Sequence, residues 1–177
     1  GVNYAVTRDW TAYALYSASF RGNGRSDSRD PQSSFLAPEE GVGFEVGTKV
    51  SLIDRKLTGT VALFEVTKKN IRRVDSGAIV EGRNGVVLSD GEQSKGVELD
   101  LLYTPNRNLT AVLAYAHTDA KITKDVINPG ASPDLDRDGK ADTIGLRLKG
   151  VAPNAVSLWL KYELTAGPLN GLVAGTG

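Results

Sequence analysis

Residues 96–122 read GVELDLLYTPNRNLTAVLAYAHTDAKI, which is two long runs on either side of the short polar segment PNRN. In the first run, Val97, Leu99, Leu101 and Tyr103 alternate with Glu98, Asp100, Leu102 and Thr104. A period of two places alternate side chains on opposite faces of a β-strand. Both runs exceed the roughly 5–6 residues of an ordinary globular strand and reach the roughly 9–11 residues that cross a bilayer. The stretch therefore predicts a long antiparallel hairpin.

The same alternation recurs along the chain, in segments rich in Thr, Val, Tyr, Phe and Leu. It predicts strands at about 10–21, 41–53, 57–73, 94–105, 109–123 and 154–166, and a further strand that starts near 171. Residues 1–6 have the pattern of the end of an earlier strand. The chain is therefore expected to be all-β.

The connections between these strands alternate in length. TRD (7–9), DRK (54–56), PNRN (105–108) and AGPLNG (166–171) are short, whereas 22–40, 74–93 and 124–153 are long. In an up-and-down meander, all short turns then lie at one end and all long loops at the other. Transmembrane β-barrels of the outer membrane have short periplasmic turns and long extracellular loops, and the alternation favours this architecture.

The two faces of the expected strands differ in polarity. In GFEVGTKVSL (43–52), Phe44, Val46, Val50 and Leu52 share one face, and Glu45 and Lys49 share the other. A single-layered wall between lipid and a wet lumen needs such a pattern. A soluble β-sandwich also alternates, with its apolar side chains inside, so the pattern alone leaves both architectures open.

Aromatic residues lie near the ends of the expected strands, at Trp10, Tyr103, Tyr115 and Tyr162. A girdle of aromatic side chains at the level of the lipid head groups has this distribution. Aromatic residues also favour strands in general, which gives the same positions without a membrane.

Composition excludes several classes of protein. The 177 residues carry 21 basic and 21 acidic side chains, and the basic ones are scattered, so no nucleic-acid partner is indicated. Cysteine is absent, which excludes disulfides and thiolate metal sites. No apolar run reaches the roughly 18 residues of a transmembrane helix.

Three stretches, in this order, resemble the barrel of TonB-dependent outer-membrane receptors, and the ferric-siderophore branch most. They are PEEGVGFEVGTKVSLIDRKLTGTVALFEVTKKNI (38–71), GEQSKGVELDLLYTPNRNLTAVLAYAHTDAKI (91–122) and VAPNAVSLWLKYEL (151–164). The motifs that carry the resemblance are Pro38-Glu39, Glu45-x-Gly47-x-Lys49, the strand from Phe64 to Lys69-Asn70, Ser94-x-Gly96-x-Glu98 and the strand from Pro153 to Trp159. Each motif is weak alone, whereas their order and spacing are specific.

The resemblance implies an antiparallel up-and-down transmembrane β-barrel of 22 strands, of which this chain would be an internal slice of about 7–8 strands from the second half. It implies a bacterial outer-membrane location and a plug domain outside this chain. It also implies three kinds of partner: a ferric siderophore or similar ligand for transport, outer-membrane lipid and lipopolysaccharide, and a TonB-type energy-transducing protein that acts through the plug.

An acidic loop contains the sharpest local motif, ASPDLDRDGKADTIG (131–145). Asp134, Asp136 and Asp138 precede Gly139 in the order of a calcium loop, and the Lys140 carbonyl and the Asp142 carboxylate could complete the oxygen ligands. Position 12 of an EF-hand would be Gly145 rather than Glu, so a full EF-hand is excluded. A looser Ca²⁺ site and a metal-free turn at Asp-Gly remain the two interpretations.

Nothing in the sequence indicates catalysis. His117 is the single histidine, and we expect it to line the end of a strand. The segment GNGRS (22–26) lacks the Gly-Lys-Ser/Thr ending of a phosphate-binding loop. The chain is therefore not expected to be an enzyme.

Basic residues gather at the end of the expected strand 57–73, at Lys68, Lys69, Arg72 and Arg73. They would attract an anionic ferric complex at the mouth of a barrel. The alternatives are a solvated strand end and contacts with lipopolysaccharide phosphates.

The preferred hypothesis is thus the wall and extracellular loops of an energy-coupled outer-membrane transporter. One rival is a secreted, soluble, calcium-binding β-sandwich or carbohydrate-binding module, in which the face of Val156, Leu158, Leu160 and Tyr162 would be buried. A second rival is the wall of a passive porin, which shares the sheet and lacks a plug.

Overall fold

The computed structural model describes residues 1–25, 34–74, 86–89, 91–124 and 144–177. These residues form an eight-stranded antiparallel sheet in the order β1-β2-β3-β4-β7-β8-β9-β10, and a two-stranded sheet of β5 and β6. The strands are β1 (Val2–Ala5), β2 (Trp10–Arg21), β3 (Glu39–Leu52), β4 (Leu57–Lys69), β5 (Ile71–Val74), β6 (Val86–Ser89), β7 (Glu92–Tyr103), β8 (Leu109–Ile122), β9 (Asn154–Glu163) and β10 (Val173–Thr176). The described residues contain no helix that is long and apolar enough to cross a membrane.

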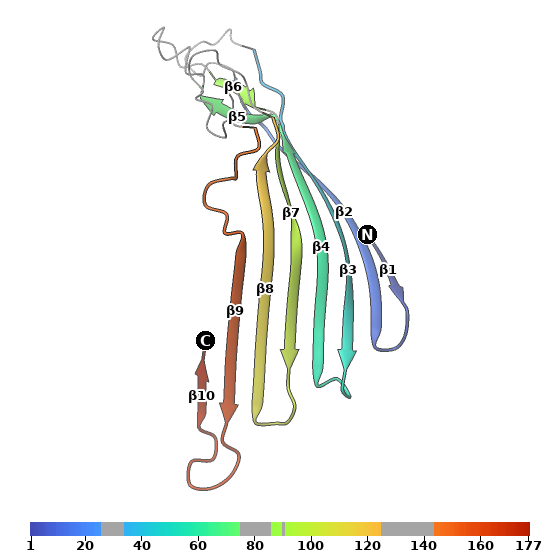
Figure 1. The fold of residues 1–177 in the computed structure, drawn as a ribbon, viewed down its shortest axis with the longest axis vertical. Coiled ribbons are helices and arrows are strands. Elements are labelled where there is room, and N and C mark those ends of the chain that lie inside the picture. Colours follow the sequence, from blue (N-terminus) through green and yellow to red (C-terminus); the bar gives the residue numbers. More distant parts are fainter. Residues whose placement is uncertain (26–33, 75–85, 90, 125–143) are drawn as a thin grey trace.

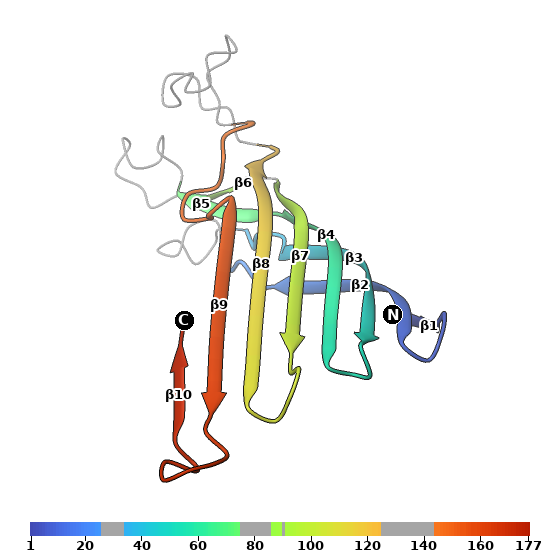
Figure 2. The same cartoon turned by 60° about the horizontal axis from the view of Figure 1, so that its bottom comes forward.

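The large sheet is an up-and-down meander, because its strands follow one another in chain order and pair antiparallel. All short turns lie at the lower end in Figure 1, and the longer connections leave from the upper end. Turned by 60°, the sheet is a single curved layer (Figure 2). The predicted all-β meander is confirmed, and the strand bounds agree with the predicted ones to within three residues, apart from the strand expected at 57–73.

That strand is two strands rather than one. It ends at Lys69, and Asn70 adopts a left-handed backbone with φ 56°, a conformation that Asn tolerates better than most residues. Beyond it, β5 leaves the large sheet and pairs with β6, so the connection expected over 74–93 contains a strand of its own. The expectation of one continuous strand to residue 73 was wrong, because the alternation of side chains does not reveal a reversal of φ.

The register assigns every residue of the large sheet to a face. Directly paired residues share a face, as Tyr16 and Phe44 do in one pair and Phe44 and Glu65 in the next. One face, here called the apolar face, carries Phe44, Val46, Val61, Leu63, Val97, Leu99, Leu113, Leu158 and Leu160. The opposite face carries Tyr13, Glu45, Lys49, Glu98 and Asp100 and is called the polar face.

No second layer of described residues covers the apolar face. Phe44 is 57% exposed, Leu158 50% and Leu160 38%, and the only fully buried apolar side chains of the described residues are Ala62 and Ala120. A β-sandwich would bury this face between two sheets. The described part of the chain therefore has the form of a wall and not of a sandwich.

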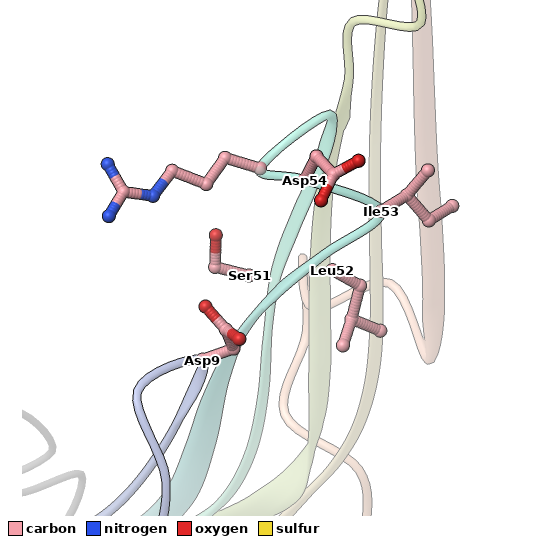
Figure 3. A pocket seen from close by; sticks show the side chains of 6 residues that line it. Asp9, Ser51, Leu52, Ile53 and Asp54 are labelled. Carbon is pink, nitrogen blue, oxygen red and sulfur yellow. The ribbon is translucent and has the colours of Figure 1, made fainter.

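The bend between β3 and β4 has a left-handed backbone at three successive residues. Ile53, Asp54 and Arg55 all have positive φ, at 54°, 54° and 66°, and the Lys56 N–H donates to the Ile53 carbonyl at 3.0 Å. The neighbouring turn is tied to it, since the Ser51 N–H donates to the Asp9 carbonyl at 2.8 Å. Figure 3 shows Asp9 and Ser51 on one side of this bend and Ile53 and Leu52 on the other, around a recess of about 560 Å³.

Candidate functional site

The polar face is organised around aromatic side chains that lie across glycines of the next strand. Tyr13 in β2 is paired with Gly47 in β3, and a Cβ on Gly47 would come within 2.7 Å of the Tyr13 ring. The Tyr13 hydroxyl donates a hydrogen bond of 2.6 Å to Glu45 Oε1, and Lys49 Nζ lies 5.3 Å from the ring centroid. The residues of the motif Glu45-x-Gly47-x-Lys49 therefore surround the side chain of a single tyrosine. We call such a glycine, together with the aromatic ring that lies across it, a seat.

A second seat of this kind joins β4 and β7. Phe64 is paired with Gly96, and a Cβ at Gly96 would lie 2.9 Å from Phe64 Cζ and would also collide with the His117 carbonyl oxygen. The motif Ser94-x-Gly96-x-Glu98 thus needs its glycine because an aromatic ring and a neighbouring backbone approach it together. Sequence reasoning found both motifs but missed Tyr13 and Phe64, since partners across strands depend on register.

Carboxylates gather on the polar face between these two seats. Glu45 and Glu98 line a recess of about 270 Å³ together with Leu15, Ser17 and Phe64. Asp100 follows Glu98 on the same face of β7. These carboxylates give this part of the polar face a negative charge, and they offer hydrogen-bond acceptors to whatever lies beside it.

A charged group lies at the upper end of the polar face. Arg21 Nη2 is 2.7 Å from Glu39 Oε2, and Lys68 Nζ is 4.0 Å from Glu39 Oε1. Glu39 is largely covered, with 14% of its side chain exposed, whereas Arg21 and Lys68 remain 74% and 52% exposed. Two cations with open faces therefore surround one carboxylate at the loop end of β2, β3 and β4.

Asn23 fixes the first long connection to this end of the sheet. Its side chain is 5% exposed, and its Nδ2 donates to the Ala37 carbonyl at 2.7 Å and to the Asn70 carbonyl at 2.6 Å. Asn70 Nδ2 in turn donates to the Pro38 carbonyl at 2.9 Å. These bonds, called here the asparagine clasp, join the loop between β2 and β3 to the corner between β4 and β5, a role that the pattern GNGRS did not suggest.

The structure does not gather the four predicted ligand-binding residues on one face. Lys68 and Lys69 point to opposite faces, because Lys68 pairs with Glu92 and shares the polar face, whereas Lys69 pairs with Glu40. Arg72 is exposed on β5, beyond the bend at Asn70. The backbone of Arg73 pairs with Val87 in the small sheet.

The predicted calcium loop lies outside the described residues, since Asp134, Asp136, Asp138, Lys140 and Asp142 all fall in 125–143. Within the residues that are described, no group of three or more His, Cys, Asp or Glu side chains is placed to hold a metal ion. The calcium site therefore remains a prediction.

His117 lies near the upper limit of the apolar residues, on the apolar face. Its Nδ1 is 2.9 Å from Asn154 Oδ1, which also accepts a hydrogen bond of 3.0 Å from the Tyr115 hydroxyl.

The four aromatic residues expected in a girdle, Trp10, Tyr103, Tyr115 and Tyr162, all belong to the apolar face by register. They are 45%, 38%, 37% and 49% exposed in that order, as side chains at a lipid boundary would be.

Comparison with known proteins gives the chain its relatives. The family model described as "TonB dependent receptor-like, beta-barrel" matches residues 1–177. The chain is 30% identical over 178 residues to the ferrichrome outer membrane transporter/phage receptor of Escherichia coli strain K12, covering 100% of this chain and 21% of the relative. It is 33% identical over 176 residues to the metal-pseudopaline receptor CntO of Pseudomonas aeruginosa, covering 99% of this chain and 22% of the relative.

Solved structures agree on the fold. The alcaligin outer-membrane receptor FauA of Bordetella pertussis matches 98% of this chain with a TM-score of 0.65, at 21% identity and over 27% of its own length. The ferripyoverdine receptor of Pseudomonas aeruginosa, bound to ferripyoverdine, matches 98% of this chain with a TM-score of 0.69, at 19% identity and over 21% of its length. At this identity the likeness is one of fold.

Both lines of comparison show how much of a barrel is present. The chain spans about a fifth of the length of the curated relatives above, so its curved sheet is a fragment of a larger barrel wall. The apolar face is then the lipid-facing side and the polar face the lumenal side. The match over the whole chain shows that this protein belongs to the TonB-dependent receptor β-barrel family of the bacterial outer membrane.

Proposed function

We propose that the chain supplies part of the wall and three outer loops of an energy-coupled transporter that imports an iron–siderophore complex. The observation that carries the proposal is the match of residues 1–177 to the receptor barrel. Relatives at 33% and 28% identity are named as receptors for metal-pseudopaline and for ferrioxamine B. Ferric siderophores are large, scarce and frequently anionic, which fits a receptor with a hydrated lumen and a charged mouth.

In this proposal the chain has a positioning and not a catalytic role. The ligand binds to outer loops and to a plug, a TonB-type partner withdraws or rearranges the plug, and the ligand passes along the lumenal face. Glu45, Glu98 and Asp100 keep that face wet and give the plug polar partners. The asparagine clasp holds the first outer loop above the mouth.

Arg21 and Lys68 are the described cations best placed to attract an anionic chelate. Both lie on the lumenal face at the loop end, with more than half of each side chain exposed. Lys69, Arg72 and Arg73 would contribute from outside the lumen or from the small sheet. The ligand-binding role of all these residues is part of the proposal.

An uptake experiment tests the proposal. The full-length receptor is expressed in a strain without other ferric-siderophore receptors, and uptake of radiolabelled iron is measured with hydroxamate, catecholate and aminocarboxylate chelates. We expect saturable uptake of one class, which stops when the TonB-type partner is deleted or the proton gradient is collapsed. Uptake that continues without energy coupling would instead identify the passive pore.

The mouth is tested with paired variants of the same receptor. Lys68→Gln should raise the Kd of the transported chelate several-fold, because one cation is removed from the lumenal mouth. Lys69→Gln removes the same charge from the adjacent, outward-facing position and should raise that Kd clearly less than Lys68→Gln does. Equal effects of the two substitutions would contradict the assignment of Lys68 to the mouth.

Ca²⁺ in the acidic loop is a separate proposal. Titration calorimetry of the full-length receptor should show Ca²⁺ binding that is lost when Asp134, Asp136 and Asp138 are all changed to Asn. Heat of binding that survives these changes would exclude the loop as the calcium site.

A further inference from the structure

Glu39, the acidic residue of the Pro38-Glu39 motif, lies between two cations of the lumenal face. It begins β3 at the loop end, where Arg21 ends β2 and Lys68 stands near the end of β4. Arg21 is its direct partner across β2 and β3. Lys68 reaches it from the other side, because the direct partner of Lys68 on β3 is Gly41, which has no side chain. One carboxylate is thus shared by cations of the two neighbouring strands.

The two oxygens of the Glu39 carboxylate face different cations. Oε2 accepts a hydrogen bond of 2.7 Å from Arg21 Nη2, and Oε1 lies 4.0 Å from Lys68 Nζ. The side chain of Glu39 is 14% exposed, whereas those of Arg21 and Lys68 are 74% and 52% exposed. A molecule at the mouth of the lumen therefore meets the two cations and little of the carboxylate between them.

The asparagine clasp holds the backbone beside all three charged residues. It joins the residue two positions after Arg21, the two residues before Glu39 and the residue two positions after Lys68. The strands that carry the three residues are also paired with one another. The freedom that remains to Arg21 and Lys68 is that of their long side chains.

Glu39 restricts this remaining freedom. A ligand that must itself fix a long, mobile side chain loses affinity, because the ordering costs conformational entropy. Arg21 donates one of its five N–H groups to Glu39 and keeps others for a ligand. A planar guanidinium beside an ammonium suits a carboxylate, which offers two anionic oxygens. Glu39 thus makes the mouth less positive, but it also prepares both cations for such a group.

We infer that Glu39 is a positioning residue, which holds Arg21 and Lys68 as a two-point site for a carboxylate group of the transported chelate. The inference rests on the proposed function and extends it by naming the chemical group that this part of the mouth binds. The two effects of Glu39 on an anion have opposite signs. An anion attracted by charge alone would bind more tightly without Glu39, whereas an anion held by positioned cations would bind more weakly.

The test uses the purified full-length receptor in detergent, at constant ionic strength, with citrate, a tricarboxylate, as the probe. An amine-acylating reagent modifies exposed lysines, and mass spectrometry follows the modification of Lys68. Lys56, which is exposed at the opposite end, is the reference lysine. Citrate bound at the mouth slows the modification of Lys68, and the citrate concentration that gives half of the full protection is called the midpoint. Sucrose, which carries no charge, should not protect Lys68 at the same concentrations.

Glu39→Gln should raise the midpoint about three- to tenfold, although it makes the mouth more positive. Glu40→Gln is the matched control, because it makes the same change of charge one residue away on the outer face, and it should not raise the midpoint. In a receptor that already carries Arg21→Gln, Glu39→Gln should no longer raise the midpoint, because the stronger of its two contacts is already lost.

Glu39→Asp keeps the charge but shortens the side chain, so it should also raise the midpoint, and it replaces Glu39→Gln if that variant does not fold. A midpoint that is unchanged or lower without Glu39, or a wild type in which citrate does not protect Lys68, would overturn the inference. Because citrate binding is measured without transport, an uptake assay that refutes siderophore import leaves this result standing, and the reverse holds as well.

Discussion

Gly96 illustrates how a single position is fixed by two neighbours at once. A Cβ there would meet the His117 carbonyl on β8 and lie 2.9 Å from Phe64 Cζ on β4. The neighbour in the first direction is backbone, which cannot rotate away as a flexible side chain can. A residue other than glycine must therefore move a strand or expel the ring.

Gly96→Ala is expected to destabilise the folded barrel by about 1–3 kcal/mol, the usual cost of overpacking a filled site. The yield of heat-modifiable, folded receptor in the outer-membrane fraction measures the effect. Gly22→Ala is the control, because nothing lies within 4 Å of a Cβ at that glycine. Equal folded yields of the two variants would refute the seat described for Phe64.

Tyr13 offers the second prediction at this scale. Tyr13→Phe keeps the ring over Gly47 but removes the donor to Glu45, whose hydrogen bond is 2.6 Å long, and should cost about 1–3 kcal/mol. Urea unfolding of the full-length receptor in detergent measures the change. Tyr16→Phe on the same strand is the control, because Tyr16 stands on the apolar face against Phe44, with ring centroids 5.1 Å apart. A double change with Glu45→Gln should be less than additive if the two side chains interact.

At the scale of elements, the sequence predicted the long strands and their order well, and the residues that pair across strands poorly. Alternation marks β7 to within two residues and β8 to within one, since period two is visible within one strand. The break at Asn70 escaped notice because a positive φ leaves no trace in that period. Lys68 and Lys69 were grouped because they are adjacent in sequence, although the same alternation places adjacent residues on opposite faces.

The candidate site was predictable only in part for a related reason. Motifs within one strand, such as Glu45-x-Gly47-x-Lys49, are visible in the sequence. The aromatic partners of these motifs, Tyr13 and Phe64, are brought there by the register between strands. No local pattern encodes such partners.

The asparagine clasp yields a prediction for an element. Asn23→Ala removes the donor to the carbonyls of Ala37 and Asn70, at 2.7 and 2.6 Å, and leaves both acceptors without it. The loop after β2 should open locally more often, and trypsin should cleave the folded receptor after Arg25 several-fold faster. Asn108→Ala, which removes a bond of 2.7 Å to the Glu163 carbonyl at the opposite end, should leave that cleavage rate unchanged. A rate unaffected by Asn23→Ala would show that the clasp does not hold the loop.

For the whole molecule, the central property is the difference between two faces of one layer. The two faces lie in different media, so the same substitution has different consequences on adjacent residues. Leu158 lies on the lipid-facing side and Ser157 on the lumenal side of β9. This pair allows the assignment of the faces to be measured directly.

Leu158→Arg should lower barrel stability in lipid by about 2–4 kcal/mol, the cost of a basic side chain near the bilayer midplane. Ser157→Arg places the same side chain one residue away in a hydrated lumen and should cost much less. Reversible unfolding of the full-length receptor into urea from lipid vesicles compares the two variants. A larger loss for Ser157→Arg would reverse the assignment of inside and outside.

The unequal lengths of the connections at the two ends of the sheet bear on how such receptors diversify. Residues inserted into a long connection leave the pairing of the wall unchanged, because the strands on either side are already held by their neighbours. If one residue were inserted into β4, the strand that follows the bend at 53–56, every side chain after the insertion would change to the opposite face and so to the wrong medium. Insertions and deletions can therefore accumulate in the long connections over evolutionary time, whereas the strands of the wall change mainly by exchanging one amino acid for another.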